Sequence, residues 1–127
     1  MLINLWAMWC APCVAELPEL EQVRAEFAPK GLSVLGLCVE GLDASADMAQ
    51  TADRLPRFVA RRNLGFEVWL FEGRSDAPIF QALPLPRARS AGGIPITLAV
   101  DKDGKVVDFI EGQASAEQFE ELARKLL

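Results

Sequence analysis

The chain contains no histidine and only three cysteines among its 127 residues. Without histidine, it cannot supply a Cys–His or Ser–His catalytic pair, nor a histidine ligand for zinc, copper or haem. Three thiols are also too few for one chain to close a zinc or iron–sulfur site built from four thiolates. Chemistry must therefore depend on cysteines and carboxylates, and a thiolate-bound metal would have to be shared between chains.

Long apolar runs and an excess of positive charge are absent as well. No run approaches the roughly 18 apolar residues of a membrane helix, and the N-terminal residues lack the basic region and cleavage site of a signal peptide. A net charge of -5 and a pI near 4.7 argue against binding to nucleic acid or anionic membranes. The length suits one domain. We therefore expect a single domain over residues 1–127 with no membrane span and no nucleic-acid partner.

Two of the cysteines form a C-x-x-C motif, Cys10-Ala11-Pro12-Cys13, between a predicted strand (2–6) and a predicted helix (12–27). Unpaired backbone N–H groups at a helix N-terminus stabilise an anion, so a thiol there ionises below the free value of about 8.5. Pro12 suits the first helical turn, where its missing N–H is not needed. If Cys10 caps the helix, its sulfur faces solvent, and Cys13 lies one turn deeper as a resolving thiol.

A lone C-x-x-C motif is ambiguous, because half of a zinc site has the same spacing. One alternative is therefore a metal-binding or redox-silent interaction module that uses the motif as a half-site between chains. The surroundings favour redox chemistry, since residues 32–39 form a near-continuous apolar run typical of a buried parallel strand and complete a β-α-β unit.

The rest of the chain alternates between strands and helices. We expect a helix over residues 44–63, divided into two pieces or kinked at Pro56. A capping box of Ser115 and Gln118 begins a last helix that reaches about residue 126, with i,i+4 pairs Glu120–Arg124 and Glu121–Lys125. Further expected elements are strands at 66–71, 95–100 and 105–111, a hairpin turn at 101–104, a short helix at 78–83 and a loop at 84–93. This layout predicts an α/β fold with a mixed central sheet of about five strands and helices on both faces.

Three segments carry a family resemblance: Leu5-Trp6-Ala7-Met8-Trp9-Cys10-Ala11-Pro12-Cys13, Glu16-Leu17-Pro18, and Gly93-Ile94-Pro95-Ile96-Thr97. With them the chain resembles the thioredoxin superfamily and, within it, the TlpA-like thiol–disulfide oxidoreductases that include ResA and DsbE-type proteins. The resemblance implies a thioredoxin fold. The strands that begin at residues 66, 32, 2, 95 and 105 would lie side by side in the sheet in that order. It also implies a cis Ile94–Pro95 bond that faces the cysteines.

The family also implies protein disulfide or dithiol substrates, a redox partner and a periplasmic or exported location, although this chain shows no signal peptide. We expect a monomer without a dissociable cofactor. Two departures stand out: the chain begins at the strand leading to the cysteines, so we expect the usual N-terminal extension to be lacking, and residues 84–93 resemble an insertion. Arg87 and Arg89 in that loop either raise the positive potential near the thiolate or are simply solvated.

Glu16 follows Cys13 by three residues and falls on the apolar stripe of the first helix. A buried carboxylate beside a buried thiol would have a raised pKa and could exchange protons with Cys13. The alternatives are favourable placement in the helix dipole or a solvated carboxylate at the edge of the stripe. Asn4 stands where the resemblance implies a buried aspartate in many thioredoxins. Its neutral amide would remove that proton acceptor and could bond neighbouring backbone.

The sequence thus assigns roles around the motif. Cys10 is the attacking thiol, Cys13 resolves the mixed disulfide, and Glu16 accepts or donates the proton of Cys13. The residues expected to contact the partner are Trp9, Pro12, Ile94 and Pro95. Trp9 would form an apolar collar over Cys10, whereas Trp6 is expected to pack in the core. Cys38 lies in an apolar run and is expected to be a small buried hydrophobe.

Overall fold

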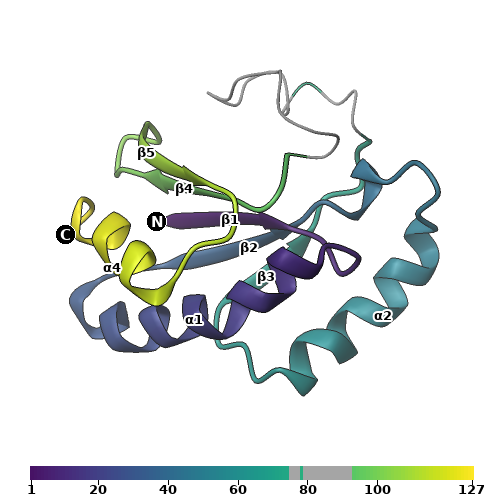
Figure 1. Cartoon of the computed structure of the whole chain (residues 1–127), viewed down its shortest axis with the longest axis horizontal. Coiled ribbons are helices and arrows are strands. Elements are labelled where there is room, and N and C mark those ends of the chain that lie inside the picture. The colour runs from purple at the N-terminus through teal and green to yellow at the C-terminus, as the bar shows by residue number, and fades with distance from the viewer. Residues whose placement is uncertain (75–77, 79–92) are drawn as a thin grey trace.

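Five strands form one mixed sheet in the order β3-β2-β1-β4-β5 (Figure 1). The computed structural model describes residues 1–74, 78 and 93–127. Within them, β1 (Leu2–Trp6), β2 (Val34–Cys38) and β3 (Glu67–Leu70) pair in parallel, and β4 (Ile96–Val100) and β5 (Val106–Glu111) complete an antiparallel side. The predicted strand order and the α/β thioredoxin fold are confirmed. The predicted helix at 78–83 and loop at 84–93, with Arg87 and Arg89, lie outside the described residues apart from Pro78 and Gly93.

The described helices are α1 (Ala11–Phe27), α2 (Met48–Arg61) and α4 (Ala116–Arg124) (Figure 1). Buried apolar residues of all three belong to one cluster with residues of the sheet. The 3-10 turns η1 (Ala28–Lys30) and η2 (Glu40–Leu42) follow α1 and β2. The apolar stripe of α1 is buried, and its members are Cys13, Leu17, Leu20, Val23 and Phe27. Complete burial of one such side chain stabilises the fold by about 1.5–3 kcal/mol, so this stripe fixes α1 firmly on the sheet.

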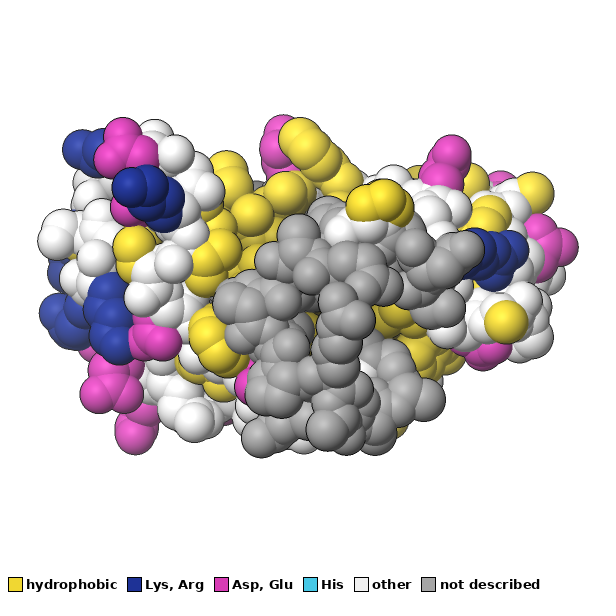
Figure 2. All heavy atoms as spheres, turned by 90° about the horizontal axis from the view of Figure 1, so that it is seen from above, with side chains coloured by type: hydrophobic (Ala, Val, Ile, Leu, Met, Phe, Trp, Pro, Cys, Tyr) yellow, Lys and Arg dark blue, Asp and Glu magenta, His cyan; other side chains and the backbone are white. Residues whose placement is uncertain are grey.

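The opposite face of the sheet carries a second apolar cluster, made of Leu5, Val39, Ile96 and Leu98. Figure 2 views the molecule from above Figure 1 and shows apolar side chains on the part of this face that the structure describes. Residues two apart on a strand point to the same face, so β1 divides its side chains between the two clusters. Among the described helices, none is long and apolar enough to cross a membrane.

Of the two forms expected for the helix at 44–63, the division into two pieces is wrong, because α2 continues through Pro56 as one helix. Proline removes one backbone donor, but both Pro56 and Ala52, whose carbonyl loses its partner, are exposed to water. In α4 the capping box and the Glu120–Arg124 pair are present. Lys125, however, pairs with Asp108 of β5 in place of Glu121, because the end of α4 lies beside that strand.

The end of β1 determines where the chemistry is placed. Because β1 and β2 are parallel, their carboxyl ends meet at one edge of the sheet. β1 ends at Trp6, and four residues later Cys10 becomes the cap of α1. Strand β4 begins at the same edge, since it runs antiparallel to β1 with Leu5 opposite Ile96.

Candidate active site

Cys10 and Cys13 form a disulfide at the N-terminus of α1, with their Cα atoms 5.3 Å apart. Cys10 is the N-cap residue, as expected, and Pro12 lies exposed in the first turn. The expected exposure of the Cys10 sulfur is wrong: the residue is 6% exposed, and Cys13 is fully buried. The carbonyl oxygen of Ile94 lies 3.9 Å from the Cys10 sulfur, so the segment that precedes β4 helps to cover it.

The Ile94–Pro95 peptide bond is cis and directly precedes β4, which confirms the expectation from the resemblance. Pro95 is buried, whereas Ile94 is half-buried. The Gly112 backbone N–H donates to the Pro95 carbonyl over 2.8 Å and ties this segment to the end of β5. The structure therefore brings Ile94 and Pro95 to the same edge as the two cysteines.

Glu16 is fully buried in α1, three residues after Cys13 on the same helix face. Its Oε1 accepts a hydrogen bond from Asn4 Nδ2 over 2.8 Å, and its Oε2 accepts one from the Ala114 backbone N–H over 2.8 Å. Burial raises the pKa of Glu16 to about 7, and these two hydrogen bonds offset only part of that effect. The alternative of a solvated carboxylate is therefore wrong.

Asn4 joins the site to two strands through its side chain, and the expected bonds to neighbouring backbone are not made. Its Nδ2 donates both to Glu16 and to Thr97 Oγ1, the latter over 2.9 Å. Its Oδ1 is buried without a hydrogen-bond partner within the described part of the chain. The amide thus connects β1 with the carboxylate on α1 and the hydroxyl on β4, and both of its hydrogens are used.

Glu40 is a carboxylate that the sequence analysis missed. Its Oε2 accepts from the Met8 backbone N–H over 2.9 Å, and its carbonyl oxygen accepts from Trp9 Nε1 over 3.1 Å. Trp9 is 42% exposed, so one edge of its ring is fixed while the rest faces solvent beside Cys10. The sequence did contain a signal for Glu40, which directly follows the apolar run at 32–39. Because the carboxyl ends of neighbouring parallel strands meet at one edge of the sheet, this position is expected to lie near the active-site loop.

Cys38 is a free, fully buried thiol at the end of β2. Burial raises the pKa of the thiol, and the nearby charge of Glu40 raises it further. Its sulfur lies 3.4 Å from Glu40 Oε2, to which the thiol donates. This confirms the expectation of a buried, unbridged cysteine. Trp6 is likewise in the core, where its ring centroid lies 5.5 Å from that of Phe58.

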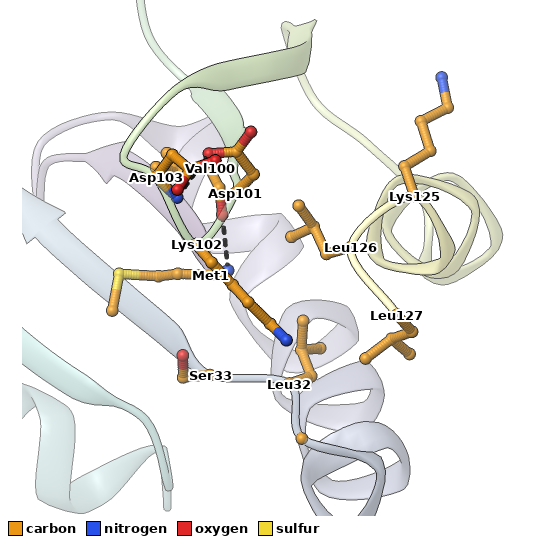
Figure 3. A pocket seen from close by; sticks show the side chains of 11 residues that line it. Met1, Leu32, Ser33, Val100, Asp101, Lys102, Asp103, Lys125, Leu126 and Leu127 are labelled. Atoms are coloured by element: carbon orange, nitrogen blue, oxygen red, sulfur yellow. Dashed lines mark hydrogen bonds between the residues drawn. The ribbon is translucent and has the colours of Figure 1, made fainter.

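A pocket of about 520 Å³ lies at the far end of the sheet from the cysteines (Figure 3). Met1, residues 101–103 of the hairpin turn and residues 125–127 after α4 are among those that line it, and the Met1 amino group donates to the Val100 carbonyl over 2.9 Å. None of the residues that the sequence analysis assigned to the site lines this pocket. The candidate chemistry is therefore at the opposite edge.

The strand order, together with a disulfide at the first turn of the helix that follows the central strand, defines a thioredoxin fold. Residues 1–109 match the model of the AhpC/TSA family. The chain belongs to this family and is a TlpA-like member of the thioredoxin superfamily.

Curated relatives include the thiol-disulfide oxidoreductase ResA of Bacillus thuringiensis subsp. konkukian, which is 28% identical over 126 residues. The match covers 99% of this chain but 62% of that protein, so the chain spans about three-fifths of its relative's length. A thiol:disulfide interchange protein from Chlorobium tepidum TLS has a TM-score of 0.71 at 21% identity, covering 98% of this chain and 77% of the other. A secreted thiol-disulfide isomerase from Corynebacterium glutamicum has a TM-score of 0.69 at 24% identity, and the match covers 96% of this chain and 66% of the other. At these identities the solved structures support the fold alone.

Proposed function

We propose that this protein is a thiol–disulfide oxidoreductase that exchanges the Cys10–Cys13 pair with partner proteins. The observation that carries this proposal is the disulfide itself, held at a helix N-terminus beside the Ile94 carbonyl. The unpaired amides of the first helical turn favour a thiolate at the cap position. Relatives named thiol-disulfide oxidoreductase support the same activity.

The exchange takes place in two displacements. In the reduced protein the Cys10 thiolate attacks one sulfur of a partner disulfide, so a bond between Cys10 and that sulfur forms and the partner's S–S bond breaks. The departing partner sulfur leaves as a thiolate and takes a proton. The Cys13 thiolate then attacks the Cys10 sulfur, forms the internal disulfide and releases the second partner thiolate. Two electrons pass to the partner, and a partner dithiol reverses both steps.

Glu16 acts as the proton acceptor and donor for Cys13 in this proposal. Resolution requires Cys13 to lose its proton, and a carboxylate with a pKa of about 7 exchanges protons readily near neutral pH. Glu16 and Cys13 share one buried helix face, so the proton does not have to be taken up by bulk water. Glu16→Gln should therefore change the pH profile of resolution while the disulfide still forms.

The partner would bind along the edge formed by Trp9, Pro12, Ile94 and Pro95. Trp9 and Pro12 are exposed on either side of Cys10, and Ile94 is half-buried over its sulfur. An extended peptide placed here could pair with the backbone of the segment before β4. No dissociable cofactor is required, because electrons pass between sulfur atoms. We propose a monomer that acts with a second redox protein, which restores its starting state.

We propose that the protein works in an exported or periplasmic location. Disulfides form and persist in oxidising compartments, and one structural relative is described as secreted.

The alternative is a metal-binding module that uses the C-x-x-C motif as a half-site between chains. A disulfide removes both thiolates that such a site requires, so the bonded cysteines favour redox chemistry. Metal content and free-thiol content of the purified protein distinguish the two functions. Bound metal together with three unoxidised cysteines per chain, Cys38 included, would support the alternative.

Trapping experiments test the division of roles between the cysteines. Cys13→Ser should accumulate a mixed disulfide through Cys10, because attack is retained and resolution is lost. Cys10→Ser should accumulate little, and Cys38→Ser, the matched control, should exchange like the wild type. Mass spectrometry of alkylated protein reads out each species. A reversed trapping pattern, or a bridge to Cys38, would refute the mechanism.

A further inference from the structure

Helix α2 presents a basic pocket to the loop that leads into Cys10. The pocket has a volume of about 350 Å³ and is lined by Met8, Arg54, Arg57, Phe58 and Arg61. Met8 stands two residues before Cys10, so the pocket adjoins the active-site loop. Figure 1 shows α2 beside the turn between β1 and α1.

The charge of this pocket is opposite to that of the chain as a whole. Arg54, Arg57 and Arg61 recur at i, i+3 and i+7 and therefore share one face of α2. Arg57 is paired with Asp53 over 2.7 Å. Arg54 and Arg61 have neither an ion pair nor a hydrogen bond with any described residue. Two guanidinium groups without an ion-pair partner among the described residues thus face one pocket on a protein of net charge -5.

The pocket is held in a fixed position relative to the cysteines. Its Phe58 ring packs on Trp6, the last residue of β1, with centroids 5.5 Å apart. The Arg62 guanidinium lies 4.2 Å from the centroid of the same ring. On the other wall, Glu40 accepts the Met8 backbone N–H over 2.9 Å. Both walls are therefore tied to the strand ends that carry the active-site loop.

We infer that this pocket binds an acidic segment of the partner protein that lies next to the partner's reacting cysteine. The inference rests on the proposed thiol–disulfide exchange and specifies its partner. Guanidinium groups bind carboxylates in a bidentate geometry, and within the described part of the chain Arg54 and Arg61 are not already paired. Met8 and Phe58 add apolar surface for the stems of glutamate side chains. Such a patch also raises the rate at which acidic partners reach Cys10.

The test compares the rates at which two peptides react with the reduced protein. Each peptide carries one cysteine activated as a mixed disulfide with 2-thiopyridine, a neutral leaving group, and its flanking residues are all glutamate in one peptide and all glutamine in the other. Release of the thiopyridine is followed by absorbance. We expect the glutamate peptide to react about tenfold faster at low salt, with the ratio falling as salt screens the charges.

Two double variants separate the pocket from net charge. In Arg54→Gln with Arg61→Gln, the rate ratio should fall to about one. In Lys102→Gln with Lys105→Gln, the matched control of equal charge change, the ratio should stay near ten, because these lysines lie at the far end of the sheet.

The outcomes are distinct. A ratio of one in the wild type, a ratio unchanged by the arginine variant, or a ratio lost equally in both variants would overturn the inference while the exchange itself still stands. Arginine-dependent binding to phosphatidylglycerol vesicles without preference between the peptides would also overturn it, because the acidic surface would then be a membrane. No release from either peptide would refute the proposed function.

Discussion

Replacing Glu16 by glutamine should remove a pH dependence of stability that can be worked from the structure. Burial raises the pKa of Glu16 from 4.5 to about 7, so the folded state holds a proton that the unfolded chain releases. This contribution to stability is fully present below about pH 4.5 and is lost as the pH rises through 7. A difference of about 2.5 pH units at 1.36 kcal/mol each gives about 3 kcal/mol of destabilisation at alkaline pH.

Urea unfolding of the oxidised protein between about pH 4 and pH 8 measures this effect, with tryptophan fluorescence as the probe. As the pH rises over that range, the free energy of unfolding of Glu16→Gln should increase by about 3 kcal/mol relative to that of the wild type, because glutamine does not titrate. Glu26→Gln is the matched control, since Glu26 is exposed on the same helix. Taking the difference between variant and wild type cancels all other titrating groups. A difference that stays constant with pH, or one of opposite sign, would refute a raised pKa for Glu16.

Three further outcomes are expected. Gly36→Ala should lower the free energy of unfolding, measured with urea, by about 1–3 kcal/mol, because the new Cβ would lie 2.9 Å from the Phe66 ring. A variant as stable as the wild type would contradict this close packing of Gly36 on Phe66. Glu40→Ala should lower the free energy of unfolding by about 1–3 kcal/mol, because the Met8 N–H of the active-site loop loses its acceptor. Glu40→Gln should lower it less. Equal stability of the two variants would contradict the role of Glu40 as that acceptor. Cys38 should react with iodoacetamide far more slowly in the folded protein than in urea, since it is buried and its pKa is raised; equal rates would show that the thiol is accessible.

Features with local causes could be predicted from the sequence. The last helix begins at Ser115 because Ser115 and Gln118 satisfy each other's backbone N–H groups, an interaction that needs only four consecutive residues. The hairpin turn forms where Asp101 accepts from two following N–H groups and Gly104 adopts a positive φ of 81°. The burial of Glu16 also followed from helical periodicity.

Features that depend on segments meeting in space could not be predicted in this way. Cys10 is covered by Ile94, 84 residues away; local sequence carries no signal of that contact, and only the family resemblance implied it. Glu40 reaches the active-site loop over about 30 residues, and only its place after a predicted parallel strand, not its local sequence, indicates that contact. The continuity of α2 through Pro56 depends on water reaching the freed carbonyl, which tertiary structure decides.

The Ala114–Glu16 hydrogen bond joins residues 98 positions apart, whereas the cysteines are separated by 3. Closing a short loop costs little chain entropy, but the docking of residue 114 requires nearly the whole chain to be in place. The two sulfurs can therefore meet in an unfolded or growing chain, long before the carboxylate acquires its surroundings. Oxidation of this pair is thus no measure of folding, and the titration of Glu16 near neutral pH reports that the native topology is complete.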